Sequence, residues 1–238
     1  MKRGLRLLGL VLLAALALQL YFVGRIALAA FIDPESTSFQ RSELWQVARN
    51  TGSLSWRQQW VPYAQISSHL KRAIIASEDA SFIEHDGLDI EALEKAWEKN
   101  AKAEERATGQ HAAKLPKIIG GSTITQQLAK NLFLSGERTL LRKGQELLLT
   151  LMLEALLSKQ RILEIYLNNV EWGEGVFGAE AAAQLYYRKP AARLSAMESA
   201  RLAVMLPRPK YFESRAGSPY LASRARTIMA RMGGVTPP

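Results

Sequence analysis

The first thirty residues of the chain are almost continuously apolar. Residues 7–24 read LLGLVLLAALALQLYFVG, in which Gln19 is the one strongly polar side chain. Three basic residues precede this run: Lys2, Arg3 and Arg6. About 20 apolar residues in a helix span the hydrocarbon core of a bilayer, and basic residues ahead of such a helix keep that end in the cytoplasm. The pattern predicts a cytoplasmic N-terminus and a transmembrane anchor over residues 1–32, with the rest of the chain outside the membrane.

A cleaved signal peptide would begin in a similar way. Its apolar core is usually shorter, about 7–15 residues, and a cleavage site with small residues at alternate positions follows it. Ala27 and Ala29 flank Leu28 in that manner, but the apolar run before them is longer than a signal peptide needs. A buried core helix is disfavoured by the terminal position and the preceding basic residues. We therefore predict an anchor that is not cleaved.

Beyond the anchor the pattern of apolar positions is mainly helical. Residues 33–55 begin with a polar stretch that contains Pro34, which predicts a linker. After it, few stretches alternate between apolar and polar positions as strands do. Apolar residues recur instead at helical spacing, first at Ile66, Leu70, Ala73 and Ile74. The sequence predicts a mainly α domain over residues 56–238.

Further helices are expected along this domain. Residues 91–110, rich in Ala, Lys and Glu, are typical of a solvated helix and a flexible connection. Residues 139–157 are so rich in leucine that we expect a central buried helix. Ser195 and Glu198 form a capping box ahead of a helix that ends at a proline. The other expected helices cover residues 122–134, with Ser122 as the cap, and residues 159–168.

Composition narrows the class of protein. Of the 238 residues 48% are apolar, enough for a packed core, and the formal net charge is +9. This charge suits a nucleic acid, an anionic membrane surface or a phosphate-bearing substrate. The chain has no cysteine, which excludes disulfides and thiol nucleophiles, and its three histidines lack zinc-site spacing. No nucleic-acid motif occurs, and the anchor places the domain away from nucleic acid.

Residues 78–87 contain the first candidate site, in which the adjacent acids Glu78 and Asp79 precede Phe82 and His85. Alone, these residues are compatible with the surface end of a helix. Glu78, however, directly follows an apolar helical run, so its carboxylate is expected at the edge of a buried region. Desolvation and a neighbouring acid both raise the pKa of a carboxyl group, which suits general-base work near neutral pH.

Two polar helix starts follow. Residues 120–131 place paired glycines before a hydroxyl-rich start, where backbone N–H groups can hold an anion, and Gln127 and Lys130 share a helix face. An ordinary capped helix would look the same. Arg142 and Glu146 lie one turn apart. A surface ion pair would explain them too, but the leucines that follow favour a first turn against the core or a cleft.

In this order, these segments resemble the monofunctional biosynthetic peptidoglycan glycosyltransferases, the penicillin-binding-protein-type transglycosylases that polymerise lipid II. The resemblance covers residues 60–212. Two features distinguish this chain: Arg208 stands where the family often has Asn before its final Pro, and no Ser-x-x-Lys acyltransferase motif with a following domain is present. Five motifs match the family: two acids through Phe and His to Gly at 78–87, Gly-x-Ser-Thr-x-Thr-Gln-Gln-x-x-Lys-Asn at 120–131, Arg-Lys-x-x-Glu at 142–146, Lys-x-x-Ile-Leu-x-x-Tyr-Leu-Asn at 159–168, and Glu and Ala ahead of Pro at 198–207.

The resemblance implies a lysozyme-like α fold with a small membrane-proximal lobe, at the bacterial cytoplasmic (inner) membrane. It implies two catalytic residues, Glu78 as the general base and Glu146 as a group that orients a basic side chain or the acceptor. Asp79 would place Glu78 or bind a divalent cation, Mg²⁺ or Mn²⁺; no cofactor is required by the sequence. The implied substrate-binding set is Asp79, Phe82, His85, Thr123, Gln127, Lys130 and Arg142.

Within that set, Lys130 and Arg142 would neutralise a pyrophosphate, and Thr123 and Gln127 would bond to the donor phosphate or sugar. Phe82 and His85 would shape their motif and take no part in the reaction. The implied reaction joins a strand on undecaprenyl pyrophosphate to lipid II, with inversion and a β-1,4 bond as the result. The implied partners are lipid II, the growing strand, the membrane, and other cell-wall synthesis and division proteins.

Three alternatives stay open at this point. A membrane-bound peptidoglycan lytic enzyme would also use one Glu but would not need Lys130 and Arg142 for pyrophosphate. A non-enzymatic cell-wall scaffold would be indifferent to the Glu78→Gln substitution. Residues 115–119, which read LPKII, are expected either to lie against the bilayer and help admit lipid tails or to form a solvated loop.

Overall fold

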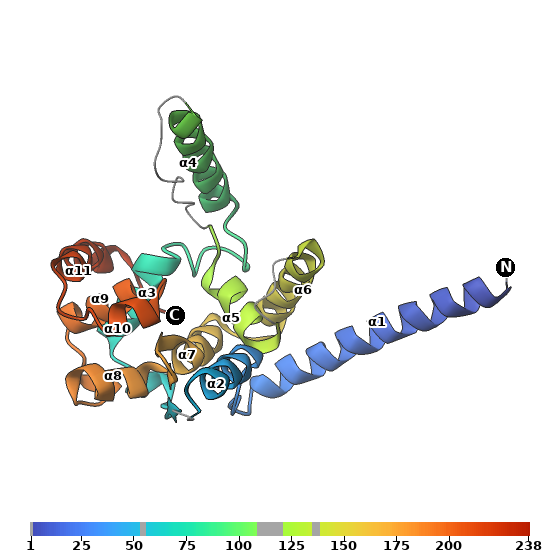
Figure 1. The fold of residues 1–238 in the computed structure, drawn as a ribbon, viewed down its shortest axis with the longest axis horizontal. Helices are drawn as coiled ribbons and strands as arrows, with labels where there is room; N and C mark the ends of the chain where they lie inside the picture. The colour runs from blue at the N-terminus through green and yellow to red at the C-terminus, as the bar shows by residue number, and fades with distance from the viewer. Residues whose placement is uncertain (1, 53–55, 109–120, 135–138) are drawn as a thin grey trace.

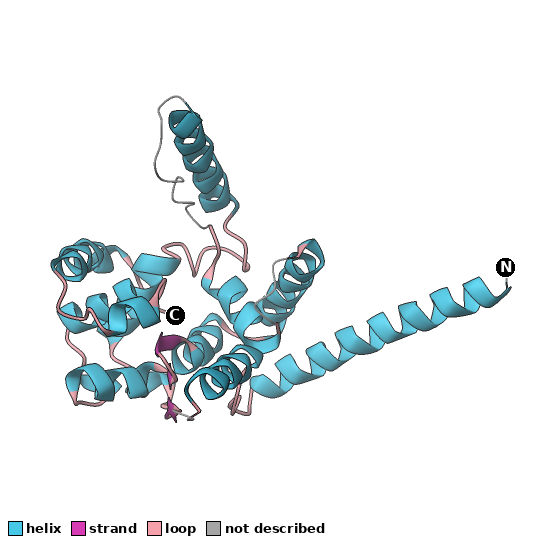
Figure 2. Cartoon of the chain, in the orientation of Figure 1, coloured by secondary structure: helices cyan, strands magenta, loops and turns pink. Residues whose placement is uncertain are grey.

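The structure, a computed structural model, describes residues 2–52, 56–108, 121–134 and 139–238. These residues are mainly α-helical, as the sequence predicts (Figure 1, Figure 2). The helices are α1 (Lys2–Ala29), α2 (Ser38–Thr51), α3 (Ser68–Glu78), α4 (Ile90–Thr108), α5 (Ile124–Phe133), α6 (Leu140–Leu156), α7 (Lys159–Asn169), α8 (Ala179–Tyr187), α9 (Ala196–Met205), α10 (Pro209–Glu213) and α11 (Pro219–Arg231). A small sheet has the strand order β1 (Arg57–Gln58), β3 (Val176–Phe177), β2 (Glu171–Gly173), in which β1 is parallel and β2 antiparallel to β3.

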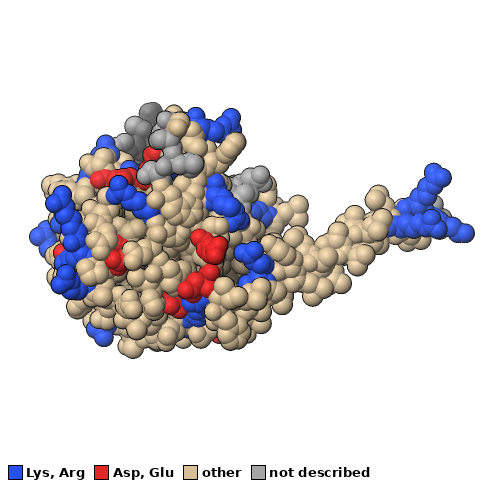
Figure 3. Space-filling model, turned by 90° about the horizontal axis from the view of Figure 1, so that it is seen from below, with Lys and Arg blue, Asp and Glu red and all other residues tan. Residues whose placement is uncertain are grey.

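Helix α1 projects from the body of the molecule (Figure 1). Within the described residues it is the one helix long and apolar enough to cross a membrane. Figure 3 shows a basic tip at its far end, separated from the body by a shaft without charged side chains. Helix α1 packs against the domain from Gln19 onward, through residues such as Phe22 and Ile26, which are buried. The length and apolar character of the helix fit a single-pass anchor, and its C-terminal end belongs to the fold.

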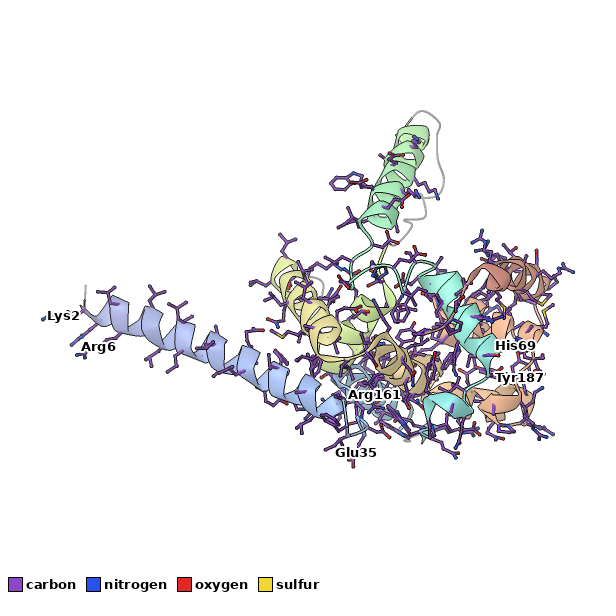
Figure 4. All side chains as sticks on the ribbon, turned by 180° about the vertical axis from the view of Figure 1, so that it is seen from behind. Lys2, Arg6, Glu35, His69, Arg161 and Tyr187 are labelled. Carbon is purple, nitrogen blue, oxygen red and sulfur yellow. The ribbon has the colours of Figure 1, made fainter. Side chains whose placement is uncertain are left out.

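Several contacts join the C-terminal end of α1 to the domain. The Phe22 ring meets the Phe133 ring edge-on, with centroids 5.4 Å apart. Arg161 donates from Nε to the Ala29 carbonyl at 2.8 Å and pairs with Asp33, and Figure 4 places Arg161 beside this end of the helix, far from Lys2 at the tip. These bonds fix the direction in which the anchor leaves the domain.

The expected linker over residues 33–55 is wrong for Ser38–Thr51, which form α2. Thr37 caps this helix by a capping box with Gln40, and both residues are fully buried. Gln40 also donates from Nε2 to Oδ1 of Asn169 at 3.3 Å. The polar stretch was expected to be a linker because its serines and threonines are common in loops, but here a hydroxyl and an amide satisfy the helix start.

Helices α3, α5, α7 and α9 form the centre of the domain, where Phe82, Tyr166 and Trp172 are among the largest fully buried side chains. The predicted helical spacing is confirmed by α3 for Leu70, Ala73 and Ile74, whereas Ile66 precedes the helix. The capping box of Ser195 and Glu198 is confirmed at the start of α9. The cap of α5 is Thr123, one residue after the expected one. The expected helix over residues 91–110 is α4, which projects from the body (Figure 1).

The Leu-rich helix α6 is not the central buried helix that its composition predicted. Its buried side chains are Glu146, Leu149, Thr150 and Leu153. One side of the helix packs on α5 and another on α1. Leucine content alone does not distinguish the interior of a protein from a surface that faces lipid. The remaining side is an exposed leucine face, formed by Leu140, Leu141, Leu147, Leu148 and Leu151.

Candidate active site

Glu78 is the last residue of α3 and is held by residues of two other helices. Its Oε2 accepts a hydrogen bond from Nε2 of Gln127 on α5, at 3.0 Å. Oε1 of Gln127 in turn accepts from the hydroxyl of Tyr166 on α7, also at 3.0 Å. The apolar residues of α3 that precede Glu78 are buried in the core. Three helices thus determine where this carboxylate lies.

The surroundings of Glu78 favour its protonation. Burial raises the pKa of this carboxyl group, the bond from Gln127 lowers it, and the charge of Asp79 raises it again, with a net increase. Burial, then the charges of Glu78 and Asp79, raises the pKa of Tyr166 well above its usual value. Tyr166 therefore stays a neutral donor at physiological pH. A carboxylate with a raised pKa accepts a proton more readily than an exposed one, as a general base must.

Asp79 joins the end of α3, where Glu78 lies, to the start of α5. Its Oδ2 accepts from the backbone N–H of Ile124 at 2.9 Å. The Gly87 N–H donates to Nδ1 of His85 at 3.1 Å, which assigns the ring proton to Nε2, and Nε2 donates to Asp79 Oδ1 at 2.9 Å. The His85 ring therefore links the Asp79 carboxylate to the backbone of Gly87. The geometry of Asp79 suits the role of placing Glu78.

Asp79, His85 and Asp89 are a candidate metal cluster in the described part of the chain, with ligand atoms within 4.8 Å of one another. Their oxygens, however, are already in use. Both oxygens of Asp79 accept the bonds just described, and those of Asp89 accept from the Ser81 hydroxyl and the Ala92 N–H. A cation would displace the His85–Asp79 bond and lack the oxygen-rich shell that Mg²⁺ prefers. These residues do not fit a preformed Mg²⁺ or Mn²⁺ site.

Two predicted substrate-binding residues make internal contacts. Phe82 has no exposed surface, and the Lys159 ammonium lies 4.7 Å from its ring centroid, so its inclusion among the substrate contacts is wrong. The Thr123 hydroxyl accepts from the Gln126 N–H as the α5 cap and donates to the Gly87 carbonyl at 2.7 Å. Gly87 itself has φ +84° and no room for a Cβ, which would lie 2.7 Å from Thr150. These contacts join the first two motifs.

The third motif lies in the first turns of α6. Glu146 is buried and accepts from Arg142 Nη1 at 2.9 Å and from the Lys143 ammonium. The Nε of Arg142 is buried and lacks a hydrogen-bond partner among the described residues, so it remains able to donate to an anion. Lys130 lies exposed on α5, the helix that packs against α6. The arrangement fits Glu146 as the residue that orients Arg142.

Two cavities of about 400 Å³ each meet at Ser77 and Glu78. The first cavity is lined by α9, α10 and α11. The second lies between the start of α4 and the start of α5, and its lining includes Asp79, Lys95 and Thr123. A general base that borders two cavities can meet one reactant in each of them.

The sequence predicts a helix over residues 159–168 but does not indicate that Tyr166 fixes Gln127. A fully buried hydroxyl needs a partner, and this requirement is the signal that was available. Lys159 bonds to Glu154 and to the His85 carbonyl, which ties α7 to the first motif. The sequence did not indicate the first cavity either, because most of its lining residues lie outside the matched motifs.

Fold and site together describe a mainly α protein with an apolar N-terminal helix and a buried carboxylate, Glu78, that borders two cavities. The chain belongs to the transglycosylase family, whose model matches residues 46–233. A biosynthetic peptidoglycan transglycosylase of Burkholderia thailandensis is 57% identical over 225 residues, which are 94% of this chain and 84% of the relative. A protein of the same name from Paraburkholderia phytofirmans is 54% identical over 229 residues, 96% of this chain and 90% of the relative. The lysozyme-like, mainly α fold and the glycosyltransferase activity implied by the motifs are thereby confirmed.

Proposed function

We propose that this protein polymerises the glycan strands of peptidoglycan from lipid II. The observation that supports this most directly is the position of Glu78, at the border of two cavities and with a raised pKa. A polymerase needs room for two sugar substrates and one base between them. The names and the high identity of the relatives support the same activity.

In the proposed reaction the growing strand, attached through its reducing-end sugar to undecaprenyl pyrophosphate, is the donor and lipid II is the acceptor. Glu78 removes the proton of the acceptor 4-hydroxyl as that oxygen attacks the donor anomeric carbon. The bond from the anomeric carbon to pyrophosphate breaks, and the electron pair leaves with the phosphate oxygen. One displacement inverts an α linkage to a β-1,4 bond. Gln127, fixed by Tyr166, keeps the carboxylate in place during this step.

The leaving group needs neutralisation of its charge and no general acid. Arg142, oriented by Glu146, and Lys130 on the adjacent helix would bind the pyrophosphate. Contacts to a group that gains charge strengthen in the transition state and so lower the barrier. A retaining or inverting glycosidase needs a second carboxylic acid to protonate its leaving group. The single base suits an activated lipid donor better than a polymeric glycan.

The enzyme is proposed to lie in the inner membrane with its N-terminus in the cytoplasm and its domain on the periplasmic side. The basic tip of α1 supports this orientation. Gln19, within the apolar run, and Gln145 on α6 exchange two hydrogen bonds, of 3.0 and 3.1 Å. With α1 across the bilayer, that pair supports a position of the α6 leucine face at the depth of the outer leaflet. Substrates with prenyl tails then reach the site from the lipid. Residues 115–119, expected either at the bilayer or in a solvated loop, lie outside the described residues.

Incubation of the full-length protein with labelled lipid II tests the proposal. A polymer that muramidase digests to disaccharide units is expected, together with release of undecaprenyl pyrophosphate. A parallel incubation with preformed, lipid-free glycan tests the lytic alternative, for which shortening of that glycan is the signature. Absence of polymer from the wild-type protein in a native-like bilayer would contradict the proposed polymerase. Glu78→Gln serves as the inactive control in both incubations.

A further inference from the structure

The first cavity has a lining that the proposed chemistry at Glu78 does not use. It lies among the end of α9, all of α10 and one side of α11. Most of its lining follows residue 206, and Glu78 is the one acidic residue in it. The lining residues are Ser77, Glu78, Ala203, Val204, Pro207, Arg208, Tyr211, Phe212, Arg215, Ser218, Tyr220, Arg224 and Ile228. This cavity is called the C-terminal pocket below.

Aromatic rings form one part of the C-terminal pocket. Phe212 is buried and stacks on Tyr220, with parallel rings and centroids 6.0 Å apart. The ring of Tyr211 meets that of Phe212 edge-on at 5.1 Å. Tyr211 and Tyr220 are each about half exposed, at 50% and 54%. Two half-exposed tyrosines held by a buried ring offer apolar faces and hydroxyl groups to a ligand that is itself part apolar and part polar.

Three arginines form the other part. No carboxylate in the described residues pairs with Arg208, Arg215 or Arg224, although the chain forms ion pairs elsewhere. The Arg215 guanidinium lies 4.3 Å from the Tyr211 ring centroid and donates to the Tyr211 carbonyl at 3.2 Å, so its position is fixed by neighbours that leave its charge uncompensated. A pocket with three cations and one acid at its edge favours an anionic ligand.

We propose that the C-terminal pocket binds a carboxylate of the peptide stem that the sugar substrate beside Glu78 carries. This inference rests on the proposed function, since it assigns a second recognition site to the same substrate. A guanidinium grips a carboxylate through two parallel hydrogen bonds, and the tyrosine rings cover the adjoining apolar side chains of the stem. A volume of about 400 Å³ suits a short peptide segment.

Pyrophosphate is the competing anion. The cations expected to hold it, Lys130 and Arg142, lie on α5 and α6 and are absent from the lining of the C-terminal pocket. The C-terminal pocket meets the proposed active site at Ser77 and Glu78. In the proposed reaction this is where the acceptor or donor sugar lies, and the lipid lies elsewhere. A group attached to that sugar is therefore closer to the three arginines than the pyrophosphate bound at α6.

Direct binding provides the first test. The probe is a lipid-free disaccharide-peptide, offered to the full-length protein in nanodiscs either with free stem carboxylates or with those carboxylates amidated. The wild-type protein should bind the free acid about tenfold more tightly, the scale of one charge-assisted hydrogen bond. Arg224→Ala should remove most of that preference. Arg226→Ala is the matched control, because Arg226 is exposed on the same helix but outside the pocket, and it should retain the preference.

Polymerisation provides the second test. With lipid II that carries free carboxylates, Arg224→Ala and Arg215→Ala should each raise KM several-fold, and with amidated lipid II the difference from wild type should largely vanish. Equal losses on both substrates, or competition by inorganic pyrophosphate for disaccharide-peptide binding, would overturn the assignment to the stem. Equal affinity of wild type for the two probes would overturn it as well. Failure of the proposed function gives a different result, since the wild type would then form no polymer from either lipid.

Discussion

The two charged regions of the site are built differently. Glu78 lies at the end of a buried helix, and its carboxylate is fixed through Gln127 and Tyr166, which are anchored in two further helices. Arg142 lies in the first turn of α6, next to the exposed leucine face, and within the described residues Glu146 is the one acid with which it forms an ion pair. The first region is held by the core of the domain, whereas the second lies where the domain meets the anchor.

This difference corresponds to two physical tasks. A general base must stay within hydrogen-bond reach of one proton, and a buried network with few rotamers provides that placement. A pyrophosphate on a prenyl chain arrives from the bilayer, so the groups that bind it must lie at the membrane surface. The anchor contact through Gln19 and Gln145 is three residues from Arg142, so in the proposed function the anchor helps to position the pyrophosphate site.

Removal of the base should have the largest effect. Glu78→Gln keeps the size of the side chain and a partner for Gln127, but a neutral amide cannot take the proton, so turnover should fall by at least about 10²-fold. The thermal unfolding temperature should change little. Glu84→Gln, at an exposed acid in the same segment, is the matched control and should retain turnover. Near-normal polymerisation by Glu78→Gln would assign the base to another residue.

The cations should follow with a smaller but coupled effect. Lys130→Ala and Arg142→Ala should each lower kcat, and the double variant should lose less free energy of activation than the sum, because both groups act on one leaving group. Arg142→Lys should restore only part of the loss, since an ammonium lacks the planar fork. A double-mutant cycle on lipid II polymerisation measures the coupling. Small, additive losses would mean that Arg142 pairs with Glu146 and does not share a pyrophosphate site with Lys130.

The comparison also explains what the sequence could and could not predict. Helices α3 and α7 and the start of α9 follow from apolar spacing and a capping box, which are local signals. The order of the motifs predicts Glu78 and Gln127 in one site. Their bond and the Tyr166 hydroxyl that fixes Gln127 depend on how α3, α5 and α7 pack, and no spacing within one helix specifies that.

The predictions that were wrong concern segments whose composition does not indicate which side chains are buried. The leucines of α6 predicted a central helix, but leucine suits lipid as well as a protein core, so composition could not place the exposed face. Ser38–Thr51 lie within the predicted linker, but Thr37 and Gln40 form a capping box that begins a helix there. The resemblance of its motif predicts Phe82 as a substrate contact, but the Phe82 ring is fully buried in the core.

The anchor contact should give a third, weaker effect. Gln19→Leu leaves the Gln145 amide without its partner, and Gln145→Leu does the reverse, so each should slow polymerisation in nanodiscs a few-fold, in line with about 0.6 kcal/mol for such bonds in membranes. The double leucine variant should recover towards wild type, since removal of both polar partners leaves no unpaired amide. Gln160→Leu, at an exposed glutamine on α7, is the control. A double variant slower than either single one would contradict this account.

The smallest effect on activity is expected at Glu171, on the side of the domain where α2, β2 and α10 meet. Burial raises the pKa of this carboxyl from 4.5 to about 7, against the opposing charge of Lys210, and its Oε1 lacks a hydrogen-bond partner among the described residues. Between pH 4.5 and 7 the folded protein keeps a proton that the unfolded chain has lost. The free energy of unfolding should therefore fall as pH rises through that window, by about 1–3 kcal/mol. Glu171→Gln should flatten this dependence, so that the variant unfolds at a higher temperature than wild type at pH 8 and at nearly the same temperature at pH 4.5.

Thermal unfolding of the full-length protein in detergent from pH 4.5 to 8 measures this slope. Glu174→Gln, at the exposed acid three residues away, should leave the slope as it is in wild type. Polymerisation should remain close to wild type in both variants, because neither residue lines a cavity at Glu78. If Glu171→Gln instead lowered stability at every pH, the carboxylate would be a stabilising partner of Lys210 in its ionised form, and burial would not be the dominant influence on its charge. That outcome would also mean that the salt bridge of 3.7 Å between Lys210 and Glu171 tightens in solution.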